Sequence, residues 1–556
     1  MATDKISIGK SFLRFYNILR LDKKDVTAIY ILAILAGLLQ LSVPLGVQTI
    51  ISFVMAGSFS TSIAVLIIMV VLGVLFNGLL QVRQLQVIEK MQQKIFLRYS
   101  FEFSDRLPKL NVEKLDSYYL PELVNRFFDT VSLQKGLEKL LLDLPAAVIQ
   151  VLFGVLLLSF YHPVFIAFGA LLLIIVIIIL RLTSPRGLAS ALQASDYKYH
   201  VAAWLEETAR VIRTFKYAKS TSMHIEKTDK LVSGYLDSRT RYFHVLLTQF
   251  WSLISFKVII TAAMLLVGAV LLVNQQINIG QFIAADIVIL AIISSVEKII
   301  LSLDKVYDAL VSVEKLGKIV DADTEEGGSI VLADNNKGVQ VRFTDAGFSY
   351  PNGSKALEKV NLTVPAGTLV HIAGASGSGK STLLRMLTGN YKNFTGSVLI
   401  DEVPVGNYNL DSLRSQTGIL LSSQDIFQGT LLENITLGNA IAMEEITALA
   451  AKTGLDQFVR SNKEGYDVIL DPTGKRLSHH VRQNILLVRA LLGKHRLLLL
   501  EEPFAHLDEE CRKQMLALIK SESNATVFIA SEDESLSDSC HMVVRMNKGT
   551  IQNNPA

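Results

Sequence analysis

Long stretches without charged side chains dominate the first half of the chain. No Asp, Glu, Lys or Arg occurs from Val26 to Val82, and Leu144–Leu180 and Val258–Ala285 are uncharged as well. A membrane-spanning helix needs about 20 apolar residues, so the first two stretches are each long enough for two crossings. The pattern predicts six membrane helices in three hairpins, with turns near Gly57, His162 and Gln275.

Positive charge gives these hairpins a direction. The three short turns carry no Lys or Arg, whereas the long connections 83–143 and 181–257 are rich in both. By the positive-inside rule, the N-terminus, both connections and the second half of the chain are cytoplasmic. The connections are too long for loops and are expected to be helices that continue out of the bilayer. A short amphipathic helix on the membrane surface is expected at Lys10–Lys24.

A few charged residues lie within or beside the predicted spans. Lys257, Glu297 and Lys298 are expected to sit near the cytoplasmic interface and extend their charged ends to water. Asp286 lies deeper, toward the outer side. An ionisable residue there either faces a polar cavity or is tolerated near the outer interface, and the sequence leaves both alternatives open.

The second half reads as a separate soluble part. Asp321–Gly338 is acidic, contains glycine and has no periodicity, so it is expected to be a linker. The predicted division is an amphipathic segment at 1–24, a six-helix membrane domain at 25–320, the linker at 321–338 and an α/β domain at 339–556. The fold class is therefore an α-helical membrane domain plus an α/β phosphate-loop domain.

The run from Gly374 to Thr382, GASGSGKST, fits the phosphate-loop pattern G-x-x-x-x-G-K-[ST]. An apolar run of strand length precedes it and a helix-forming run follows it, as the motif requires. Glycines let consecutive N–H groups face one anion, and the helix N-terminus adds a positive dipole end. Lys380 supplies a charge for the outer phosphates, and the Ser381 hydroxyl is placed for Mg²⁺. The predicted nucleotide-binding residues are Tyr350, Gly374, Ser376, Gly377, Gly379, Lys380, Ser381 and Thr382.

A second motif follows at the distance expected of a phosphate-loop enzyme. Leu497–Leu500 is an apolar strand that ends in the adjacent carboxylates of Glu501 and Glu502. Such a strand end is where Mg²⁺ and the attacking water are handled in this class of enzyme. We expect Glu501 to act on Mg²⁺ through water. Tyr350 is a candidate to stack on an adenine ring.

Composition narrows the remaining possibilities. The formal net charge of +3 is too small to suggest nucleic acid as a partner. The two cysteines, Cys511 and Cys540, have no metal-ligand spacing and are expected to be unpaired thiols in a reducing compartment. The first 24 residues mix charged and apolar residues without a small-residue cleavage site, so no cleaved signal peptide is expected.

Taken together, these features resemble a half-size ABC exporter, in which six membrane helices precede one nucleotide-binding domain. Ser422–Ile435 resembles the Q-loop segment of that family, with Gln424 at the position of its glutamine. Leu477–Gln483 sits where the family has its signature sequence, and Ala505–Asp508 resembles its D-loop. The segments 115–122 and 206–216 resemble the cytoplasmic turns that press on the nucleotide domains. Val43–Gln48, and no recognisable N-terminal peptidase domain, make the resemblance nearest to exporters of the type I secretion class.

This sequence departs from the family pattern at the site itself. The signature glycines are His479 and His480 here, although Ser478 is retained. Glu501 replaces the usual aspartate, Glu502 matches the catalytic base, and Ser531 replaces the switch histidine. In the family, two ATP molecules lie between two nucleotide domains, and each site pairs one chain's phosphate loop with the other chain's signature. Neither a homodimer nor a heterodimer of this chain leaves a site with every usual element.

The resemblance implies ATP and Mg²⁺ as cofactors, with Glu502 and Gln424 as catalytic residues and Ser381, Gln424 and Glu501 acting on the metal. We expect retained ATP binding and slow hydrolysis, coupled to export of protein or peptide across the inner membrane. The implied partners are a second half-transporter, a periplasmic adaptor, an outer-membrane channel and membrane lipid. The alternatives are a variant site that works normally, an ATP-gated scaffold or sensor that does not transport, and a channel.

Overall fold

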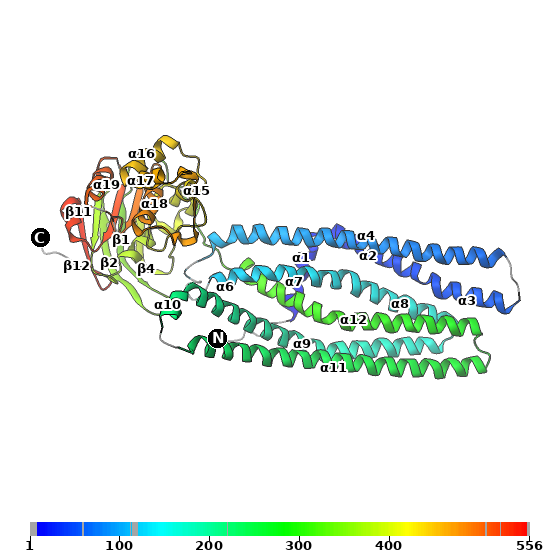
Figure 1. The fold of residues 1–556 in the computed structure, drawn as a ribbon. Helices are drawn as coiled ribbons and strands as arrows, with labels where there is room; N and C mark the ends of the chain where they lie inside the picture. The colour runs from blue at the N-terminus through cyan, green and yellow to red at the C-terminus, as the bar shows by residue number, and fades with distance from the viewer. Residues whose placement is uncertain are drawn as a thin grey trace. The chain divides into compact units, whose positions relative to one another are not determined.

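The computed structural model describes residues 8–57, 61–111, 113, 120–218, 221–505, 507, 509–522 and 524–552. The chain divides into two compact units. One comprises residues 1–110 and 118–322, and the other comprises residues 111–117 and 323–556. The first unit is helical, and the second contains the β-sheets (Figure 1).

The first unit contains the membrane helices that the sequence predicts. Among the described residues, six helical segments are long and apolar enough to cross a membrane. The hairpin turns fall at the predicted places, because α3 ends at Met55, α8 ends at Tyr161 and α11 ends at Val273. The helices are α1 (Ile8–Leu21), α2 (Lys23–Gln40), α3 (Ser42–Met55), α4 (Thr61–Arg106), α6 (Leu120–Asn125), α7 (Asp129–Glu138), α8 (Leu144–Tyr161), α9 (Val164–Arg210), α10 (Ile212–Tyr217), α11 (Met223–Val273) and α12 (Ile279–Val320).

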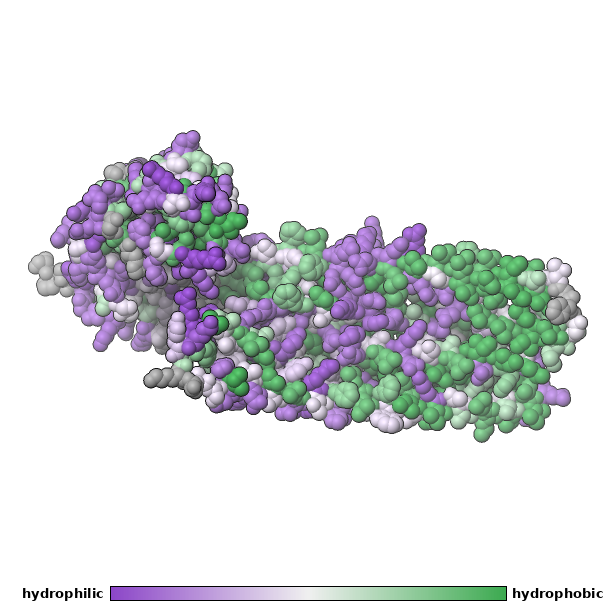
Figure 2. All heavy atoms as spheres, in the orientation of Figure 1, coloured by the Kyte–Doolittle hydropathy of each residue, from purple (hydrophilic) through white to green (hydrophobic). Residues whose placement is uncertain are grey.

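Several helices, α4, α9 and α11 among them, are much longer than a bilayer is thick. Helices α4, α9 and α11 contain 46, 47 and 51 residues. At 1.5 Å per residue each is roughly 70 Å long, against about 30 Å for the hydrocarbon core. Figure 2 shows apolar side chains covering the end of the bundle near α3 and hydrophilic side chains gathered further along the same helices. The predicted extension of the helices beyond the bilayer is therefore confirmed.

The charged residues near the spans are paired in part. Lys257 on α11 and Glu297 on α12 form an ion pair of 2.7 Å. The expectation that each extends separately to water missed this pair, because its partners lie 40 residues apart on different helices. On α1, Arg14 forms ion pairs with Glu314 at 2.7 Å and Asp321 at 2.9 Å, which ties α1 to the end of α12.

The second unit is built on two main sheets. One has the strand order β2-β1-β4-β5 and the other has the order β12-β11-β3-β10-β9-β6. Its strands are β1 (Val341–Ser349), β2 (Lys355–Val364), β3 (Leu369–Ala373), β4 (Phe394–Ile400), β5 (Val403–Pro404), β6 (Thr417–Leu420), β7 (Gly429–Thr430), β8 (Ile469–Leu470), β9 (Leu497–Glu501), β10 (Thr526–Ser531), β11 (Met542–Asn547) and β12 (Thr550–Gln552). Its helices are α13 (Lys380–Leu387), α14 (Leu410–Ser415), α15 (Leu431–Thr436), α16 (Met443–Thr453), α17 (Leu455–Ser461), α18 (His479–Leu491) and α19 (Glu509–Glu522).

The six-stranded sheet determines where the chemistry collects. Strands β3, β10, β9 and β6 are mutually parallel neighbours, and β3, β10 and the leucines of β9 are buried. Parallel strands buried on both faces read as continuous apolar runs, as these do. Because their carboxyl ends meet at one edge, the phosphate loop after β3, the carboxylates at the end of β9 and Ser531 at the end of β10 are brought together.

The segment expected to be a linker packs against the second unit. Residues 323–338 form no helix or named strand, in keeping with their lack of periodicity. Glu325 nevertheless forms an ion pair of 2.7 Å with Arg414, and the Gly328 N–H donates to the Tyr408 carbonyl at 2.8 Å. The buried guanidinium of Arg496 donates to the carbonyls of Ala333 and Lys337. This stretch is therefore attached along its length.

Candidate functional site

The loop between β3 and α13 contains three positions whose backbone conformation favours glycine. Gly374, Gly377 and Gly379 have φ values of +154°, +76° and +104°. A Cβ atom on Gly374 would lie 2.4 Å from the Met546 carbonyl oxygen, and one on Gly379 would lie 2.7 Å from the Ala356 carbonyl oxygen. Glycine avoids both the strained φ and the clash, so the loop can curl in front of the α13 N-terminus.

Two side chains of this loop are suited to an anion. Lys380 is buried, and its Nζ donates to the carbonyls of Gly374 at 2.5 Å and Ala375 at 3.0 Å. The Oγ of Ser378 is buried and has no hydrogen-bond partner among the described residues. A buried hydroxyl without a partner costs free energy, and a phosphate oxygen at the loop would satisfy it. The loop therefore fits a phosphate group.

The donor set for a divalent cation lies beside the loop. The Ser381 hydroxyl donates to Glu501 Oε1 at 2.5 Å. Ser422 holds the same carboxylate from the other side, since its N–H donates to Oε2 at 2.9 Å and its hydroxyl donates to Oε1 at 3.0 Å. A hydroxyl and a carboxylate are hard oxygen ligands of the kind that Mg²⁺ takes. Ser381 and Glu501 therefore fit a magnesium site.

Glu502 is fixed by the segment that follows β10. Its Oε2 accepts from the Ser531 hydroxyl at 2.8 Å, and its Oε1 accepts from the Glu532 N–H at 2.9 Å. Its backbone has a φ of +43°, which is uncommon for a residue with a side chain. The Gln483 amide donates to the Glu502 carbonyl at 3.0 Å and so attaches α18 to this strained position.

These groups line one cleft of about 490 Å³. Tyr350 stands in its wall, and the Tyr350 hydroxyl lies 3.0 Å from Thr382 Oγ1. The lining side chains and loop residues are Tyr350, Ser354, Lys355, Ala356, Ser376, Gly377, Ser378, Gly379, Lys380, Ser381, Thr382, Arg385, Glu501, Glu502 and Glu532. A cleft that combines a glycine loop, a lysine and paired carboxylates suits a nucleotide with several phosphates.

Gln424 is not brought into this cleft. Its Oε1 accepts from the Leu421 N–H at 3.4 Å, within its own turn, and Gln424 is absent from the cleft lining. Ser422, two residues earlier, contacts Glu501 in its place. The catalytic and metal-binding roles of Gln424 remain predictions. Arg482 and Arg489 hold this segment to α18, through an ion pair with Asp425 at 3.2 Å and a hydrogen bond to the Asn434 carbonyl at 2.7 Å.

The segment that resembles the family signature lies at the start of α18. The Ser478 hydroxyl accepts from the Val481 N–H at 3.2 Å and caps the helix, and His480 Nε2 lies 3.2 Å from Asn484 Nδ2. None of Ser478, His479 and His480 belongs to the lining of the cleft formed by this chain's own phosphate loop. In the segment that resembles the D-loop, His506 and Asp508 lie outside the described residues, as do residues 115–119 of the first predicted cytoplasmic turn.

A buried histidine lies behind the phosphate loop. His371 on β3 is fully buried, and its Nδ1 lies 3.0 Å from the Ser537 hydroxyl. Burial lowers the pKa of His371 below its ordinary value, so the ring is held neutral. Nearby, the hydrogen bond from the Ser535 hydroxyl lowers the pKa of Asp533, whose carboxylate also forms an ion pair of 2.6 Å with Arg512.

Sequence reasoning missed two residues of the site. Ser422 is a small polar residue two positions after the end of β6, and nothing in its local pattern marks it as a partner of Glu501. Glu532 directly follows the switch position, and its carboxylate lies 3.9 Å from Lys380 Nζ. The sequence feature that could have indicated Glu532 was its charge, directly after Ser531.

Comparison with solved structures confirms the fold. A bacterial Atm1-family ABC exporter with ATP bound matches with a TM-score of 0.85, at 19% sequence identity, over 96% of this chain and 94% of that one. At this identity the likeness concerns the fold alone.

Curated relatives are similar in sequence over part of their length. The alpha-hemolysin translocation ATP-binding protein of Escherichia coli O157:H7 is 31% identical over 357 residues, which cover 63% of this chain and 50% of that protein. The cyclolysin secretion/processing ATP-binding protein of Bordetella pertussis is 29% identical over 310 residues, or 55% and 43% of the two chains. The ATP-dependent lipid A-core flippase of Legionella pneumophila is 29% identical over 292 residues, or 52% and 50%. The matches span about half the length of these relatives.

Two family models match successive, separate parts of the chain. The model of the ABC transporter transmembrane region matches residues 26–296, and the ABC transporter model matches residues 357–505. The six candidate spans, together with the matches to both family models, make the chain a multi-pass inner-membrane protein with its ATPase domain in the cytoplasm. The chain therefore belongs to the ABC transporter family, with the fold of a half-size exporter.

Proposed function

We propose that this chain is the subunit of an exporter that binds ATP in the cleft beside Lys380, hydrolyses it slowly and couples it to movement of the membrane helices. One observation carries the proposal. A glycine loop, Lys380, Glu501 and Glu502 converge on a single cleft in a chain that also contains six candidate membrane spans.

Each part of the cleft has a role in this proposal. The loop N–H groups, the Ser378 hydroxyl and Lys380 bind the phosphates, and Tyr350 lies where it can contact the adenine ring. Ser381 and Glu501 would hold Mg²⁺, which offsets negative charge on the outer phosphates. Glu502 would take the proton of the attacking water, and Gln424 would enter the site only after leaving its own turn.

Slow hydrolysis follows from what surrounds Glu502. The Ser531 hydroxyl holds the carboxylate but brings no positive charge toward the outermost phosphate. The loss of one donor that stabilises a transition state typically costs about 10²–10³ in rate. His479 and His480 add Cβ atoms and imidazole rings where the family has glycines, and these hinder close approach of the backbone to a partner's nucleotide.

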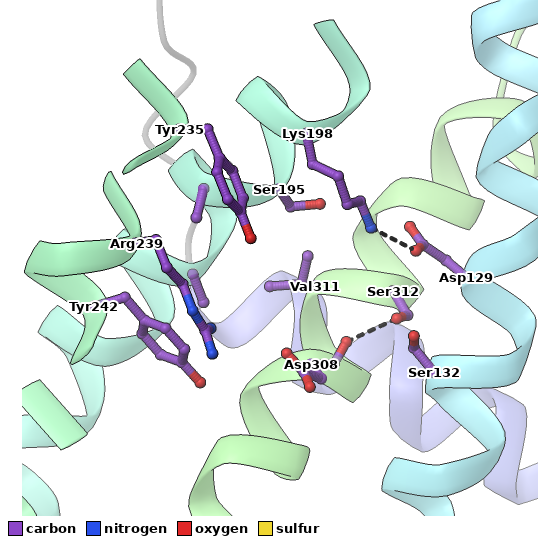
Figure 3. A pocket seen from close by; sticks show the side chains of 12 residues that line it. Asp129, Ser132, Ser195, Lys198, Tyr235, Arg239, Tyr242, Asp308, Val311 and Ser312 are labelled. Carbon is purple, nitrogen blue, oxygen red and sulfur yellow. Dashed lines mark hydrogen bonds and ion pairs between the residues drawn. The ribbon is translucent and has the colours of Figure 1, made fainter. Parts of the chain in front are cut away.

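A polar cavity lies among the cytoplasmic extensions of the helices in the first unit. It has a volume of about 210 Å³ and lies among α7, α9, α11 and α12, and its polar side chains face one another (Figure 3). Asp129 in its wall is buried and lies 3.3 Å from Lys198 Nζ, while Arg239 enters from α11. Because these parts of the helices lie outside the bilayer, polar side chains are expected there for an exporter and for a scaffold alike.

The substrate class and partners rest on similarity. Relatives named for alpha-hemolysin translocation and cyclolysin secretion favour a protein or peptide, although another relative is named as a lipid flippase. The proposed assembly is a homodimer, or a heterodimer with a second half-transporter, because each nucleotide site in the family is completed by a partner's signature. A periplasmic adaptor and an outer-membrane channel would complete a secretion path.

The test compares proteins in the medium of cells that carry the unmodified chain, Lys380→Ala or Glu502→Gln. Loss of the same secreted polypeptides with both variants, at equal membrane abundance of the chain, supports export. Unchanged secretion despite ATP binding by the unmodified chain contradicts it. The observation that favours a scaffold or sensor is the neutral Ser531 beside Glu502, and that alternative predicts ATP-dependent conformational change without any secreted product.

A further inference from the structure

Glu532 occupies a place in the cleft for which neither the sequence pattern nor the family comparison gives a role. Its carboxylate lies 3.9 Å from Lys380 Nζ, and its N–H donates to Glu502 Oε1 at 2.9 Å. Its side chain is 57% exposed and lines the cleft together with Glu501 and Glu502. One residue therefore contacts the lysine meant for phosphate through its side chain and the proposed catalytic base through its backbone.

The neighbouring residues hold Glu532 in this position. Asp533 Oδ1 accepts from the Ser535 N–H at 3.0 Å and from the Ser535 hydroxyl at 2.7 Å, which begins the turn of 534–539. Asp533 also forms an ion pair of 2.6 Å with Arg512 on α19. Since Ser531 and Asp533 are fixed on either side, the Glu532 backbone is confined beside Glu502.

The three carboxylates of the cleft differ in how their charge is satisfied. Glu501 accepts hydrogen bonds from Ser381 and Ser422, and Glu502 accepts them from Ser531 and Glu532. Among the described residues, Glu532 forms one ion pair, with Lys380 Nζ at 3.9 Å. A phosphate bound to Lys380 would therefore meet the negative charge of Glu532 at short range.

The position of Glu532 determines which phosphate it affects most. Glu502 is the group proposed to face the attacking water, so the end of the cleft beside Glu502 is the end for the outermost phosphate. Glu532 is bonded to Glu502 and so stands at that end. A diphosphate ends one phosphate earlier and carries less charge, so it experiences less repulsion.

We propose that Glu532 sets the preference of the cleft between nucleoside triphosphate and diphosphate. Its carboxylate repels the outermost phosphate and competes with that phosphate for Lys380. The inference rests on the proposed nucleotide function of the same cleft. Glu532 thereby weakens ATP binding more than ADP binding, and the effect falls as salt screens the charges. The affinity for ATP is therefore lower than it would be in the same cleft without the charge of Glu532.

The experiment uses the full chain in lipid and the variant Glu532→Gln, which removes the charge while nearly preserving the shape of an exposed side chain. Dissociation constants are measured at low salt for Mg²⁺ with a β,γ-imido analogue of ATP and for Mg²⁺ with ADP. The analogue is expected to bind about three- to tenfold more tightly to the variant. ADP affinity is expected to change less than about twofold, because less charge lies near position 532. In about 1 M salt the difference between the two chains should shrink.

The matched control is Glu534→Gln. Glu534 belongs to the same segment but forms an ion pair of 3.3 Å with Arg545 and does not line the cleft. Both affinities should be unchanged in this variant. Equal tightening of both nucleotides by Glu532→Gln, no tightening, or the same result from Glu534→Gln overturns the inference while nucleotide binding stands. If the unmodified chain binds neither nucleotide, the proposed function itself fails.

Discussion

The Ser531 hydroxyl donates a hydrogen bond of 2.8 Å to Glu502 Oε2. The proposed catalytic carboxylate is thus held in place by a neutral group, at the end of the strand where the family resemblance places a switch histidine. Serine at this position can hold the Glu502 carboxylate by a hydrogen bond, as a histidine could, but it carries no positive charge. Ser531 therefore orients Glu502 and adds no positive charge beside it.

The variant Ser531→His should raise the rate of ATP hydrolysis by about 10-fold or more, since an imidazole can reach past Glu502 with a donor that carries charge when protonated. Steady-state phosphate release by the full chain in lipid measures this. Ser531→Ala is the control, because it removes the hydrogen bond to Glu502 without adding a donor. A Ser531→His rate no higher than that of Ser531→Ala would show that the switch position does not limit catalysis.

Ser381 should govern the Mg²⁺ dependence of nucleotide binding. Its hydroxyl reaches Glu501 at 2.5 Å in the proposed metal site, so Ser381→Ala should raise the Mg²⁺ concentration needed for tight ATP binding by about tenfold. Titration of Mg²⁺ at fixed ATP gives this concentration. Ser422→Ala is the comparison, since its N–H still holds Glu501. Equal effects of the two substitutions would place the metal elsewhere.

Gly379→Ala should abolish nucleotide binding. The new Cβ atom would lie 2.7 Å from the Ala356 carbonyl oxygen, at a φ of +104° that alanine rarely adopts, so the loop must change shape. Gly406→Ala is a suitable control, because a Cβ atom there has no neighbour within 4 Å. Binding measured by equilibrium dialysis should be lost in the first variant and kept in the second. Retained binding by Gly379→Ala would contradict the proposed phosphate cradle.

Acid should destabilise the second unit through His371. Burial lowers the pKa of His371 in the folded state, whereas the unfolded chain takes up its proton near pH 6.5. The unfolded state therefore binds more protons below about pH 6.5, so the contribution of His371 to stability is present above that pH and falls as the pH drops toward the folded pKa. Thermal unfolding followed between pH 7.5 and 5.5 should show a falling midpoint.

The variant His371→Gln should show a smaller fall over the same range. Some fall should remain, because burial also lowers the pKa of His495. Ser537→Ala provides the control, since it removes the hydroxyl beside His371 Nδ1 but leaves the imidazole able to titrate. Identical pH dependence in His371→Gln and the unmodified chain would rule out this histidine as a source of acid sensitivity.

The sequence was sufficient where local chemistry determines structure. The charge-free run from Val26 to Val82 predicts two crossings whatever packs around it, and Gly374–Thr382 predicts a loop that only glycine can form. It was insufficient where residues far apart in the chain meet. The pairing of Lys257 with Glu297 depends on the register of two helices, and the contact of Ser422 with Glu501 depends on the order of strands in the sheet.

Gln424 illustrates a different limit. Its place in a motif predicts a role in the cleft, but the side chain accepts a hydrogen bond from Leu421 within its own turn. A motif fixes residue type and spacing, whereas the rotamer of a loop glutamine depends on which partner is within reach. The sequence therefore locates the segment but not the direction of the side chain.

Steady-state ATP hydrolysis in lipid shows whether His479, His480 and Ser531 slow catalysis. The unmodified chain is compared with a variant that carries His479→Gly, His480→Gly and Ser531→His together, and Glu502→Gln and Lys380→Ala define the background. We expect the unmodified chain to bind ATP and to turn it over about 10²–10³ more slowly than the triple variant, but still faster than both background variants. Equal turnover by the unmodified chain and the triple variant would contradict this expectation, because His479, His480 and Ser531 would then be compatible with ordinary catalysis.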